Sequence, residues 1–291
     1  MSLRFVLVGH PVAHSVSPAI HGAAYATLGL DHRYELVDAA DEAAVARVVE
    51  ALRRGEIAGA NVTIPWKRVA LALADVADPS AADVGAANVL TRRADGALVA
   101  FNTDVVALQR ELAALNPAPR RMLVIGSGGA ALAAVASCRL LGAEVGVVAR
   151  RFSGEPARGE GALDFEKLGA TPLAWPSDPA SRASFERFVA RADVIVQATS
   201  AGMHGADPGE GVAALVPWQE LSPDCAAYDL VYAPPETPFL RAARESGRLA
   251  RGGLGMLVGQ ARAAIELWLG RDAPEEPLLS AARAALEKRH A

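Results

Sequence analysis

Apolar and polar positions along the N-terminal part of the chain predict strands and helices in turn. Residues 4–8 form an apolar run of strand length, and 32–37 are expected to form a second strand. Between them, Ser17 and Pro18 predict a helix start, with Ser17 as N-cap and Pro18 in the first helical position. Residues 41–52 carry apolar side chains at the i, i+3, i+4, i+7 spacing of an amphipathic helix.

The same region continues with a third strand and a hairpin. Residues 59–64 are expected to form the strand. Asp95 and Gly96 are typical of a tight turn, and they separate two strand-like segments at 88–91 and 98–101. This hairpin is expected to extend the sheet of the N-terminal region.

A second series of strands and helices begins after a linker at 116–119. The strands predicted over 121–125 and 144–148 flank a helix over 130–141. Further elements are predicted as helices over 105–115, 257–269 and 278–288, as strands over 193–197 and 225–231, and as a loop over 154–161. Strands that alternate with helices predict an α/β protein whose parallel sheets are covered by helices.

The composition is that of a globular protein of about two domains. The chain has 291 residues, of which 52% are hydrophobic and 21% are charged. Lys and Arg number 29 against 33 Asp and Glu, which gives a formal net charge of −4. A weakly acidic chain without a basic block lacks the charge pattern that binds nucleic acid or an anionic membrane. We therefore expect no nucleic-acid or membrane partner, and the candidate partners are a small-molecule substrate and a second copy of the chain in a homodimer.

Neither a disulfide framework nor a membrane span is expected. Two cysteines, Cys138 and Cys225, are too few for a disulfide scaffold or a multi-cysteine metal site. Free thiols are typical of a reducing compartment and we expect no targeting segment, so a cytoplasmic location is predicted. Residues 122–138 carry no charge, but the glycines within them favour a strand, a turn and a helix over a membrane span.

The strongest local signal is a glycine-rich turn between a predicted strand and a predicted helix. Residues 126–131 match the G-x-G-x-x-G/A pattern of dinucleotide-binding turns. The glycines allow backbone N–H groups to approach a pyrophosphate closely at the start of the helix. The alternative is a glycine turn that only joins the strand to the helix. The residues expected to contact the cofactor are Gly126, Ser127, Gly128, Gly129 and Ala130.

The end of the following strand favours NADP over NAD. An NAD site usually presents Asp or Glu about 20 residues after the glycines, to bind the ribose 2′-hydroxyl. This chain has Arg150 and Arg151 there. Guanidinium groups suit a 2′-phosphate because they form paired, charged hydrogen bonds with it. A solvated basic strand end is the alternative interpretation.

Three polar segments of the N-terminal region are candidates for substrate binding. Ser15 and Ser17 are two residues apart at a helix start, where two hydroxyl donors would form a carboxylate site, unless Ser17 is only an N-cap. Asn61, Thr63 and Lys67 share parity, so an extended chain would project them to one face, with Val62 and Ile64 facing the core. An edge strand with an exposed lysine is the alternative.

Asp104 is the third candidate, since it precedes a predicted helix. It is either an N-cap or a carboxylate paired with Lys67 at a reacting hydroxyl. Lysine can act as a general acid or base, so such a pair would suit proton transfer. Sequence spacing does not show whether the two residues meet. No metal site is expected, because no zinc or Walker pattern is present.

Taken together, these segments resemble the shikimate dehydrogenase family along nearly the whole chain. The matching segments, in order, are 9–18, 59–67, 85–88, 102–104, the glycine turn, 198–203, Tyr232 with 237–240, and 253–260. Each segment alone is a modest signal, but their common order is specific. The resemblance implies two α/β domains: an N-terminal substrate-binding domain with a mostly parallel sheet, and a Rossmann-type NADP-binding domain.

The resemblance implies the reversible NADPH-dependent reduction of 3-dehydroshikimate to shikimate, a step toward chorismate and the aromatic amino acids. It implies Lys67 and Asp104 as the catalytic pair, with Ser15 and Ser17 at the substrate carboxylate. Further residues implied at the substrate are Asn61, Thr63, Asn88, Tyr232 and Gln260, and further residues implied at the cofactor are Thr199, Leu230 and Gly253.

The chain also departs from the family pattern. Ala149 and Arg151 flank Arg150 where Asn and Thr are frequent, Val89 replaces a Thr, and Val105 replaces a Gly. A dehydrogenase for quinate or an amino analogue is therefore an alternative. A silent ligand-binding regulator of the same fold is a second alternative, against which the presence of both Lys67 and Asp104 argues.

The order of the motifs predicts a discontinuous first domain. Because Gln260 belongs with the substrate motifs, residues 1–104 and 253–291 are expected to form the substrate domain. Residues 105–252 are expected to form the inserted NADP-binding domain.

Overall fold

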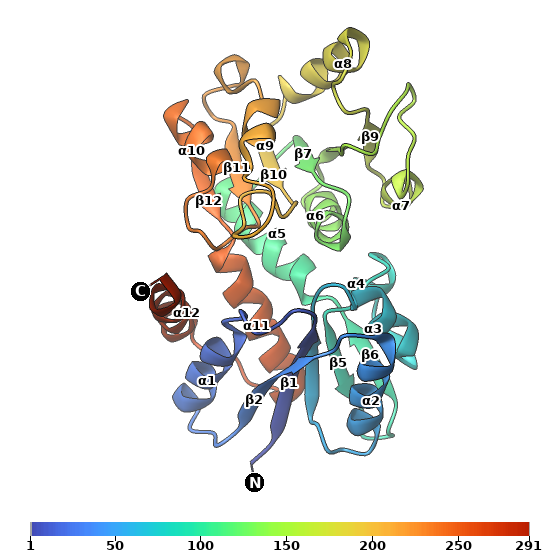
Figure 1. The fold of residues 1–291 in the computed structure, drawn as a ribbon, viewed down its shortest axis with the longest axis vertical. Helices are drawn as coiled ribbons and strands as arrows, with labels where there is room; N and C mark the ends of the chain where they lie inside the picture. Colours follow the sequence, from blue (N-terminus) through green and yellow to red (C-terminus); the bar gives the residue numbers. More distant parts are fainter. Residues whose placement is uncertain (1, 291) are drawn as a thin grey trace. The chain divides into compact units, whose positions relative to one another are not determined.

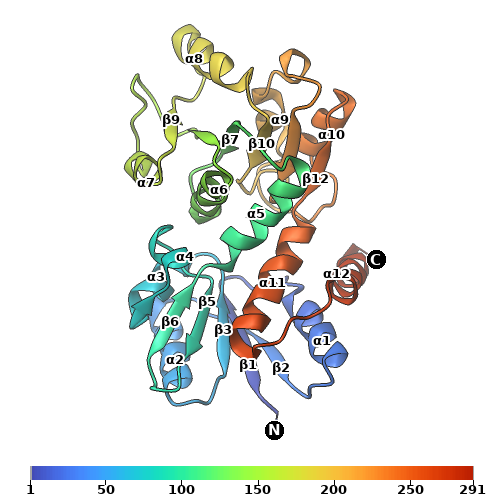
Figure 2. The same cartoon turned by 180° about the vertical axis from the view of Figure 1, so that it is seen from behind.

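The computed structural model describes residues 2–290, which divide into two compact units. The first unit joins the residues up to Ala107 to those from Leu257 onward, and the second runs from Leu108 to Met256. The two divisions fall within helices α5 (Thr103–Leu115) and α11 (Leu254–Leu269), which Figures 1 and 2 show as continuous. The first unit is therefore discontinuous in sequence.

A six-stranded mixed sheet forms the centre of the first unit, with the order β2-β1-β3-β5-β6-β4. Strand β1 pairs in parallel with β2 and β3, and β4 pairs in parallel with β6, whereas β5 is antiparallel to both of its neighbours. The strands are β1 (Arg4–Gly9), β2 (Arg33–Asp38), β3 (Gly59–Val62), β4 (Val76–Ala77), β5 (Val89–Arg92) and β6 (Leu98–Phe101).

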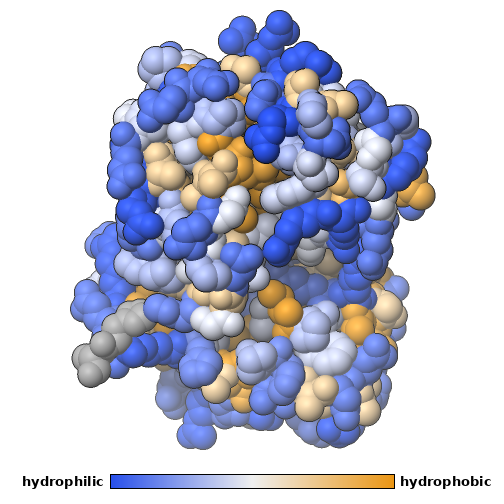
Figure 3. All heavy atoms as spheres, turned by 45° about the horizontal axis from the view of Figure 1, so that its top comes forward, coloured by the Kyte–Doolittle hydropathy of each residue, from blue (hydrophilic) through white to orange (hydrophobic). Residues whose placement is uncertain are grey.

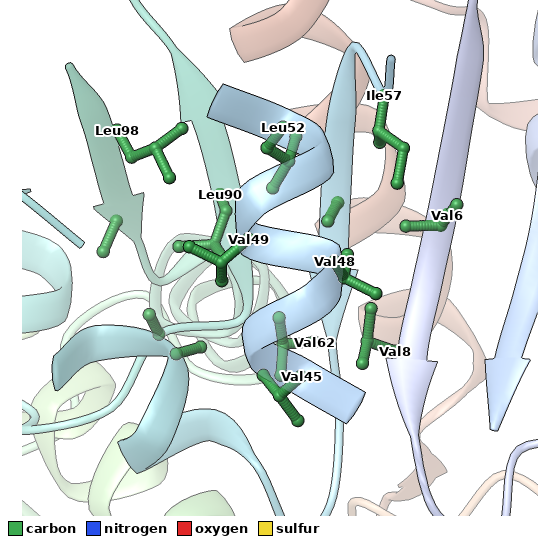
Figure 4. Close-up of a cluster of buried hydrophobic side chains, with 14 of the residues drawn as sticks. Val6, Val8, Val45, Val48, Val49, Leu52, Ile57, Val62, Leu90 and Leu98 are labelled. Carbon is green, nitrogen blue, oxygen red and sulfur yellow. The ribbon is translucent and has the colours of Figure 1, made fainter. Parts of the chain in front are cut away.

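Alternate side chains of β1 enter two different cores. Val6 and Val8 face helix α2 (Glu42–Arg53), whose buried valines and leucine pack on this face of the sheet (Figure 4). Phe5 faces the opposite side, where its ring stacks on Trp268 of α11 at 4.8 Å between centroids. The packing of Trp268 on the sheet explains why the C-terminal segment belongs to the first unit. The other helices of this unit are α1 (Ser17–Thr27), α3 (Lys67–Leu73), α4 (Pro79–Ala82) and α12 (Glu275–His290).

Two local predictions for the first unit are wrong. Helix α1 begins at Ser17 itself, and Val16 occupies the N-cap position without a capping side chain. Strand β3 ends at Val62, so the chain is not extended as far as Lys67, which is the first residue of α3. Ile64, which the strand pattern places in the core, is 71% exposed. The chain leaves the sheet at Thr63, and strand parity no longer applies beyond that residue.

An entirely parallel six-stranded sheet forms the centre of the second unit. Read from one edge, the order is β9-β8-β7-β10-β11-β12, which is the 3-2-1-4-5-6 order of a doubly wound dinucleotide-binding fold. The strands are β7 (Arg121–Ile125), β8 (Glu144–Val148), β9 (Thr171–Leu173), β10 (Val194–Gln197), β11 (Ala226–Asp229) and β12 (Ala250–Gly252). The order of the strands reverses between β7 and β10, where such folds bind ligands.

The second core lies between this sheet and its helices. Apolar residues of β7, β10 and β11 pack against Phe185, Phe188, Trp218 and Phe239. Phe188 lies so close to β8 that a Cβ added to Gly146 would be 2.6 Å from its ring. The helical segments are α6 (Gly129–Leu140), α7 (Ala162–Lys167), α8 (Pro179–Val189), α9 (Glu210–Leu215), the 3-10 helix η1 (Trp218–Glu220) and α10 (Pro238–Glu245).

The uncharged segment 122–138 forms β7, the glycine turn and most of α6, as predicted. Across residues 2–290, no helix has the length and apolar character needed to cross a membrane. Figure 3 shows a face on which hydrophilic residues predominate and hydrophobic residues form scattered groups.

Candidate active site

Polar side chains gather at one edge of the first sheet because of the strand directions. The parallel strands β1 and β3 end at this edge, and antiparallel pairing brings the start of β5 and the end of β6 to the same place. Asn61 of β3 is therefore opposite Val89 of β5, and Val89 is opposite Phe101 of β6. Residues next to these positions meet although they are far apart in sequence.

Lys67 and Asp104 form an ion pair at this edge. Lys67 Nζ lies 2.5 Å from Asp104 Oδ2. The two side chains are only 21% and 10% exposed, so water screens the pair much less than it screens a surface ion pair. Asp104 is not the N-cap of its helix, since Asn102 Oδ1 accepts the hydrogen bond of the Asp104 backbone N–H.

Asn88 holds the second oxygen of the Asp104 carboxylate. Its Nδ2 donates to Asp104 Oδ1 at 2.9 Å and lies 3.0 Å from Thr103 Oγ1. Asn88 Oδ1 accepts from the Thr103 backbone N–H at 2.7 Å, which fixes the orientation of the amide. With both carboxylate oxygens bound, Asp104 cannot rotate without breaking a hydrogen bond.

Asn61 joins the same buried network. It is 4% exposed, and its Nδ2 donates to the Asn88 carbonyl oxygen at 3.3 Å. The hydroxyl of Tyr34 donates to Asn61 Oδ1 at 2.6 Å. Sequence reasoning missed Tyr34, because a tyrosine in a strand is most often a packing residue.

Thr63 directly follows β3 and lies beside the last residues of β1. A Cβ added to Gly9 would be 2.3 Å from Thr63 Cγ2, so only glycine allows this close approach. The Thr63 backbone N–H donates to the Val8 carbonyl oxygen at 2.8 Å, which holds Thr63 beside the strand ends.

Ser15 and Ser17 meet in the segment between β1 and α1. Ser15 Oγ lies 3.0 Å from Ser17 Oγ and accepts a hydrogen bond from the Ser17 backbone N–H at 3.2 Å. The side chain of Ser17 is not used as an N-cap. The two hydroxyls therefore lie together at the start of α1, where the helix dipole favours an anion.

Arg289 is a residue of this site that sequence reasoning missed. From the C-terminal helix α12, its guanidinium donates to the carbonyl oxygens of His14 and Ser15, with Nη2 2.8 Å from the Ser15 oxygen. A lone arginine near the end of the chain carries no sequence signal for this contact.

Gln260 lies on α11, in the part of this helix that belongs to the first unit. Its Nε2 donates to the Leu257 carbonyl oxygen at 2.8 Å. The preceding Gly259 packs against α5, since an added Cβ would be 3.3 Å from the Ala107 Cβ. Ala107 is three residues beyond Asp104, so α11 packs on the helix that carries the Asp104 carboxylate.

The glycine turn of the second unit follows β7 at the switch point of the parallel sheet. Gly126 has a φ of +136°, and an added Cβ would be 2.7 Å from the Ala198 carbonyl oxygen just beyond β10. Both the backbone conformation and this contact require glycine. Helix α6 begins at Gly129, one residue earlier than predicted, and Gly128 is its N-cap.

The other two glycines leave open space in front of the helix start. A Cβ added to Gly128 or Gly129 would have no neighbouring heavy atom within 4 Å. Both residues are exposed, whereas Ser127 and Ala130 are half-buried. Exposed backbone N–H groups at the start of α6 suit a pyrophosphate, so these residues fit a dinucleotide.

The two arginines after β8 have different surroundings. The Arg150 side chain is 75% exposed, and its Nη1 lies 3.4 Å from Asp207 Oδ2. Arg151 instead donates to the carbonyl oxygen of Ser127 in the glycine turn. Arg150 therefore remains available to a phosphate, whereas Arg151 is bonded to the turn.

Four further predicted residues follow the ends of β10, β11 and β12. Thr199 lies beside the glycine turn, with its Cγ2 3.3 Å from the position of a Gly126 Cβ. Leu230 and Gly253 are in contact, since a Cβ on Gly253 would be 2.2 Å from the Leu230 carbonyl oxygen. Tyr232 follows β11 in the same segment as Leu230 and is half-buried.

A buried polar network holds these segments, and sequence reasoning missed it. Asp229 accepts hydrogen bonds from Thr237 Oγ1 at 2.6 Å, the Val231 backbone N–H at 2.9 Å and Gln197 Nε2 at 3.2 Å. Burial raises the pKa of Asp229 to about 6, and the hydrogen bonds act in the opposite direction. The sequence signal for this network was the polar residue at the end of each of two apolar strands, Gln197 in β10 and Asp229 in β11.

Fold and site together define a class, the two-domain α/β proteins that bind a dinucleotide in one unit and carry a buried Lys–Asp pair in the other. Within residues 2–290 no group of three or more His, Cys, Asp or Glu side chains could hold a metal ion.

Comparison with known proteins agrees with this class. The family model of the shikimate dehydrogenase substrate binding domain matches residues 7–90, and that of the shikimate 5′-dehydrogenase C-terminal domain matches residues 253–283. The shikimate dehydrogenase (NADP(+)) of Geobacter sulfurreducens is 38% identical over 288 residues, which cover 96% of each chain. The chain belongs to the shikimate dehydrogenase family.

Solved structures show the same fold. The shikimate 5-dehydrogenase of Thermus thermophilus, in complex with NADP(H) and shikimate, has a TM-score of 0.80 and 36% identity. The match covers 98% of this chain and 100% of the Thermus thermophilus chain. The 5-ketofructose reductase of Gluconobacter sp. strain CHM43 also has a TM-score of 0.80, at 28% identity and with coverage of 98% and 99%.

Proposed function

We propose that this protein is an NADP-dependent shikimate dehydrogenase, which reduces 3-dehydroshikimate to shikimate reversibly. The observation that carries the proposal is the buried Lys67–Asp104 pair within a polar network at the edge of the first sheet. Family membership along the whole chain supports the same activity. A silent ligand-binding protein would have no chemical need for this pair.

The reaction needs a hydride at the ketone carbon and a proton at its oxygen. Bound NADPH supplies the hydride. Lys67 donates the proton to the ketone oxygen during reduction and takes it back from the hydroxyl during oxidation. Asp104 holds the Lys67 ammonium in place, and Asn88 keeps the carboxylate from turning.

The substrate carboxylate is bound by Ser15 and Ser17 at the start of α1. The Ser15 hydroxyl donates to Ser17 Oγ and can rotate its hydrogen toward an anion, and the Ser17 hydroxyl can donate as well, so the pair offers two donors. Asn61, Thr63 and Asn88 bind the ring hydroxyls from the strand ends, with Tyr232 and Gln260 as further contacts. Amide and hydroxyl groups suit a ligand that is rich in hydroxyls, because they can both donate and accept.

The cofactor is bound by the second unit. Residues 126–130 contact the pyrophosphate, and Arg150 contacts the 2′-phosphate, which is the reason for the preference for NADP. Arg151 supports the turn through the Ser127 carbonyl oxygen. Thr199, Leu230 and Gly253 bind the remaining ribose and nicotinamide parts. The location is inferred to be cytoplasmic, in keeping with two free cysteines that are both buried.

A spectrophotometric assay of the purified protein with shikimate or quinate, each with NADP⁺ or NAD⁺, tests the proposal. The highest kcat/KM is expected for shikimate with NADP⁺. A higher value for quinate would assign the protein to the quinate branch. Binding without turnover would identify a ligand-binding regulator instead.

A further inference from the structure

A cluster of aromatic residues lies behind Asn61, on the face of the sheet that packs against α1 and α11. It contains Phe5, Tyr25 and Tyr34 together with two histidines. Tyr34 is the member whose hydroxyl reaches the candidate site, by donating to Asn61 Oδ1 at 2.6 Å. The ring of the fully buried His21 stacks on Tyr34, with 3.8 Å between centroids and 10° between the planes.

The direction of each hydrogen bond at Asn61 follows from the chemistry of its partners. The Asn88 carbonyl oxygen can only accept, so the Nδ2 atom of Asn61 must face it. The opposite atom, Oδ1, is an acceptor, so the Tyr34 hydroxyl must donate to it. Burial raises the pKa of Tyr34 well above its ordinary value, so the hydroxyl keeps this proton.

We propose that Tyr34 is a positioning residue, held in place by His21, which fixes the amide of Asn61 so that its remaining N–H is offered to an oxygen of the substrate. The proposal rests on the function proposed above, in which Asn61 contacts a ring hydroxyl. It makes Tyr34 a residue that acts on substrate affinity through Asn61. It assigns Asn61 the role of donor toward the ligand.

His21 supports Tyr34 by stacking and not by hydrogen bonding. Among the described residues, neither Nδ1 nor Nε2 of His21 has a hydrogen-bond partner. Burial lowers the pKa of His21 to about 3, so the ring is neutral near pH 7. A neutral ring that lies parallel to Tyr34 restricts the tilt of the phenol and thereby the direction of its hydroxyl.

Tyr25 provides a matched control within the same cluster. Its ring contacts Phe5 and His21, and its side chain is as buried as those of the sheet core. Its hydroxyl has no hydrogen-bond partner within residues 2–290, whereas that of Tyr34 has one. Tyr25→Phe and Tyr34→Phe therefore each remove one oxygen atom from the cluster, and only the second removes a hydrogen bond to Asn61.

The experiment is a double-mutant cycle of Tyr34→Phe and Asn61→Leu, with Tyr25→Phe as control. In each variant, kcat, KM for shikimate and KM for NADP⁺ are measured. Y34F is expected to raise the KM for shikimate about tenfold, which is the effect of about 1.4 kcal/mol. KM for NADP⁺ should stay within about twofold, and Y25F should leave both KM values within the same range. In the N61L background, Y34F should have no further effect on the KM for shikimate.

Three results would overturn the proposal. The first is an unchanged KM for shikimate in Y34F, the second is an equal rise in Y25F, and the third is an undiminished effect of Y34F in the N61L background. If the wild-type protein does not oxidise shikimate, the proposed function fails and this inference fails with it, whereas each of the three results above overturns the inference alone. These two failures are therefore separate.

If Y34F alone does not fold, the folding of Y34F/N61L, followed by urea unfolding, carries the test. Y34F leaves the buried Asn61 Oδ1 without its donor, whereas Y34F/N61L removes both partners of the hydrogen bond. Because no buried acceptor is left unpaired in the double variant, Y34F/N61L is expected to fold although Y34F does not. If N61L and Y25F fold but Y34F/N61L does not, a hydrogen bond between Tyr34 and Asn61 in solution is contradicted.

Discussion

Lys67 Nζ and Asp104 Oδ2 are 2.5 Å apart, although 37 positions separate the two residues in the chain. Lys67 is the first residue of α3, and Asp104 lies in the first turn of α5. Both helices start at the same edge of the first sheet, and this edge brings the ammonium and the carboxylate together.

Loss of the Lys67 ammonium should slow the chemical step. Lys67→Ala is expected to lower kcat for shikimate oxidation by about 10²-fold or more, because the variant lacks the group that takes the proton from the hydroxyl. Steady-state kinetics measure the effect, and Lys167→Ala, at an exposed lysine of α7, is the control. Near-normal turnover of K67A would refute the role of Lys67 in proton transfer.

The two arginines after β8 should affect the two cofactors differently. Arg150→Ala is expected to raise the KM for NADP⁺ about tenfold and to leave that for NAD⁺ nearly unchanged, because only NADP⁺ carries the 2′-phosphate. Arg151→Ala should raise both values, since Arg151 bonds the glycine turn that both cofactors use. Arg182→Ala, which removes an exposed arginine paired with Glu186, is the control. Equal effects of R150A on both cofactors would contradict the assignment.

The contact of Arg289 with the serine segment should support binding of the substrate carboxylate. Arg289→Gln is expected to raise the KM for shikimate about three- to tenfold with little change in kcat, because the loop that carries Ser15 loses two hydrogen bonds. Arg283→Gln on the same helix is the matched control, because the exposed Arg283 pairs with Glu276 of its own helix, with 3.9 Å between Nη1 and Oε1. If R289Q and R283Q have the same KM, the contact has no role in binding.

His21 should make the protein sensitive to acid. Its pKa is about 3 in the folded protein, against 6.5 as its ordinary value, because burial disfavours the charged ring. Between these two pH values the unfolded chain binds more protons, so stability falls as the pH drops below 6.5. The slope of this loss is up to about 1.4 kcal/mol per pH unit. His21→Phe keeps a stacked ring but has no proton to bind.

Urea unfolding at pH 7 and pH 5 measures this difference. From pH 7 to pH 5, the wild-type protein is expected to lose about 2 kcal/mol more of its free energy of unfolding than H21F loses. Tyr25→Phe, which changes a neighbouring buried ring and leaves His21 in place, should lose as much as the wild type. Equal losses of the free energy of unfolding in the wild type and H21F would show that the pKa of His21 is the same in the folded and unfolded states.

Local signals in the sequence are sufficient for some elements and insufficient for others. Strands 121–125 and 144–148 have the bounds that the sequence predicts, because both are apolar runs between clear turn residues. Short elements such as α3, β4 and β9 escape prediction, because a few residues carry no periodic pattern. Helix α8 was not predicted, although Asp178 and Ser181 form a capping box at its start and Pro179 follows the N-cap.

Local patterns along the chain are enough to give the α/β class, the glycine turn and the residue types of the site. These features depend on the period of apolar positions, the φ that glycine allows and the order of the motifs. Which polar residues meet is a consequence of the three-dimensional fold. Strand pairing brings Asn61, Asn88 and Asp104 to one sheet edge, and no local pattern encodes that pairing. The contacts of Tyr34 and Arg289 likewise depend on packing between distant segments, so they could not be derived from spacing along the chain.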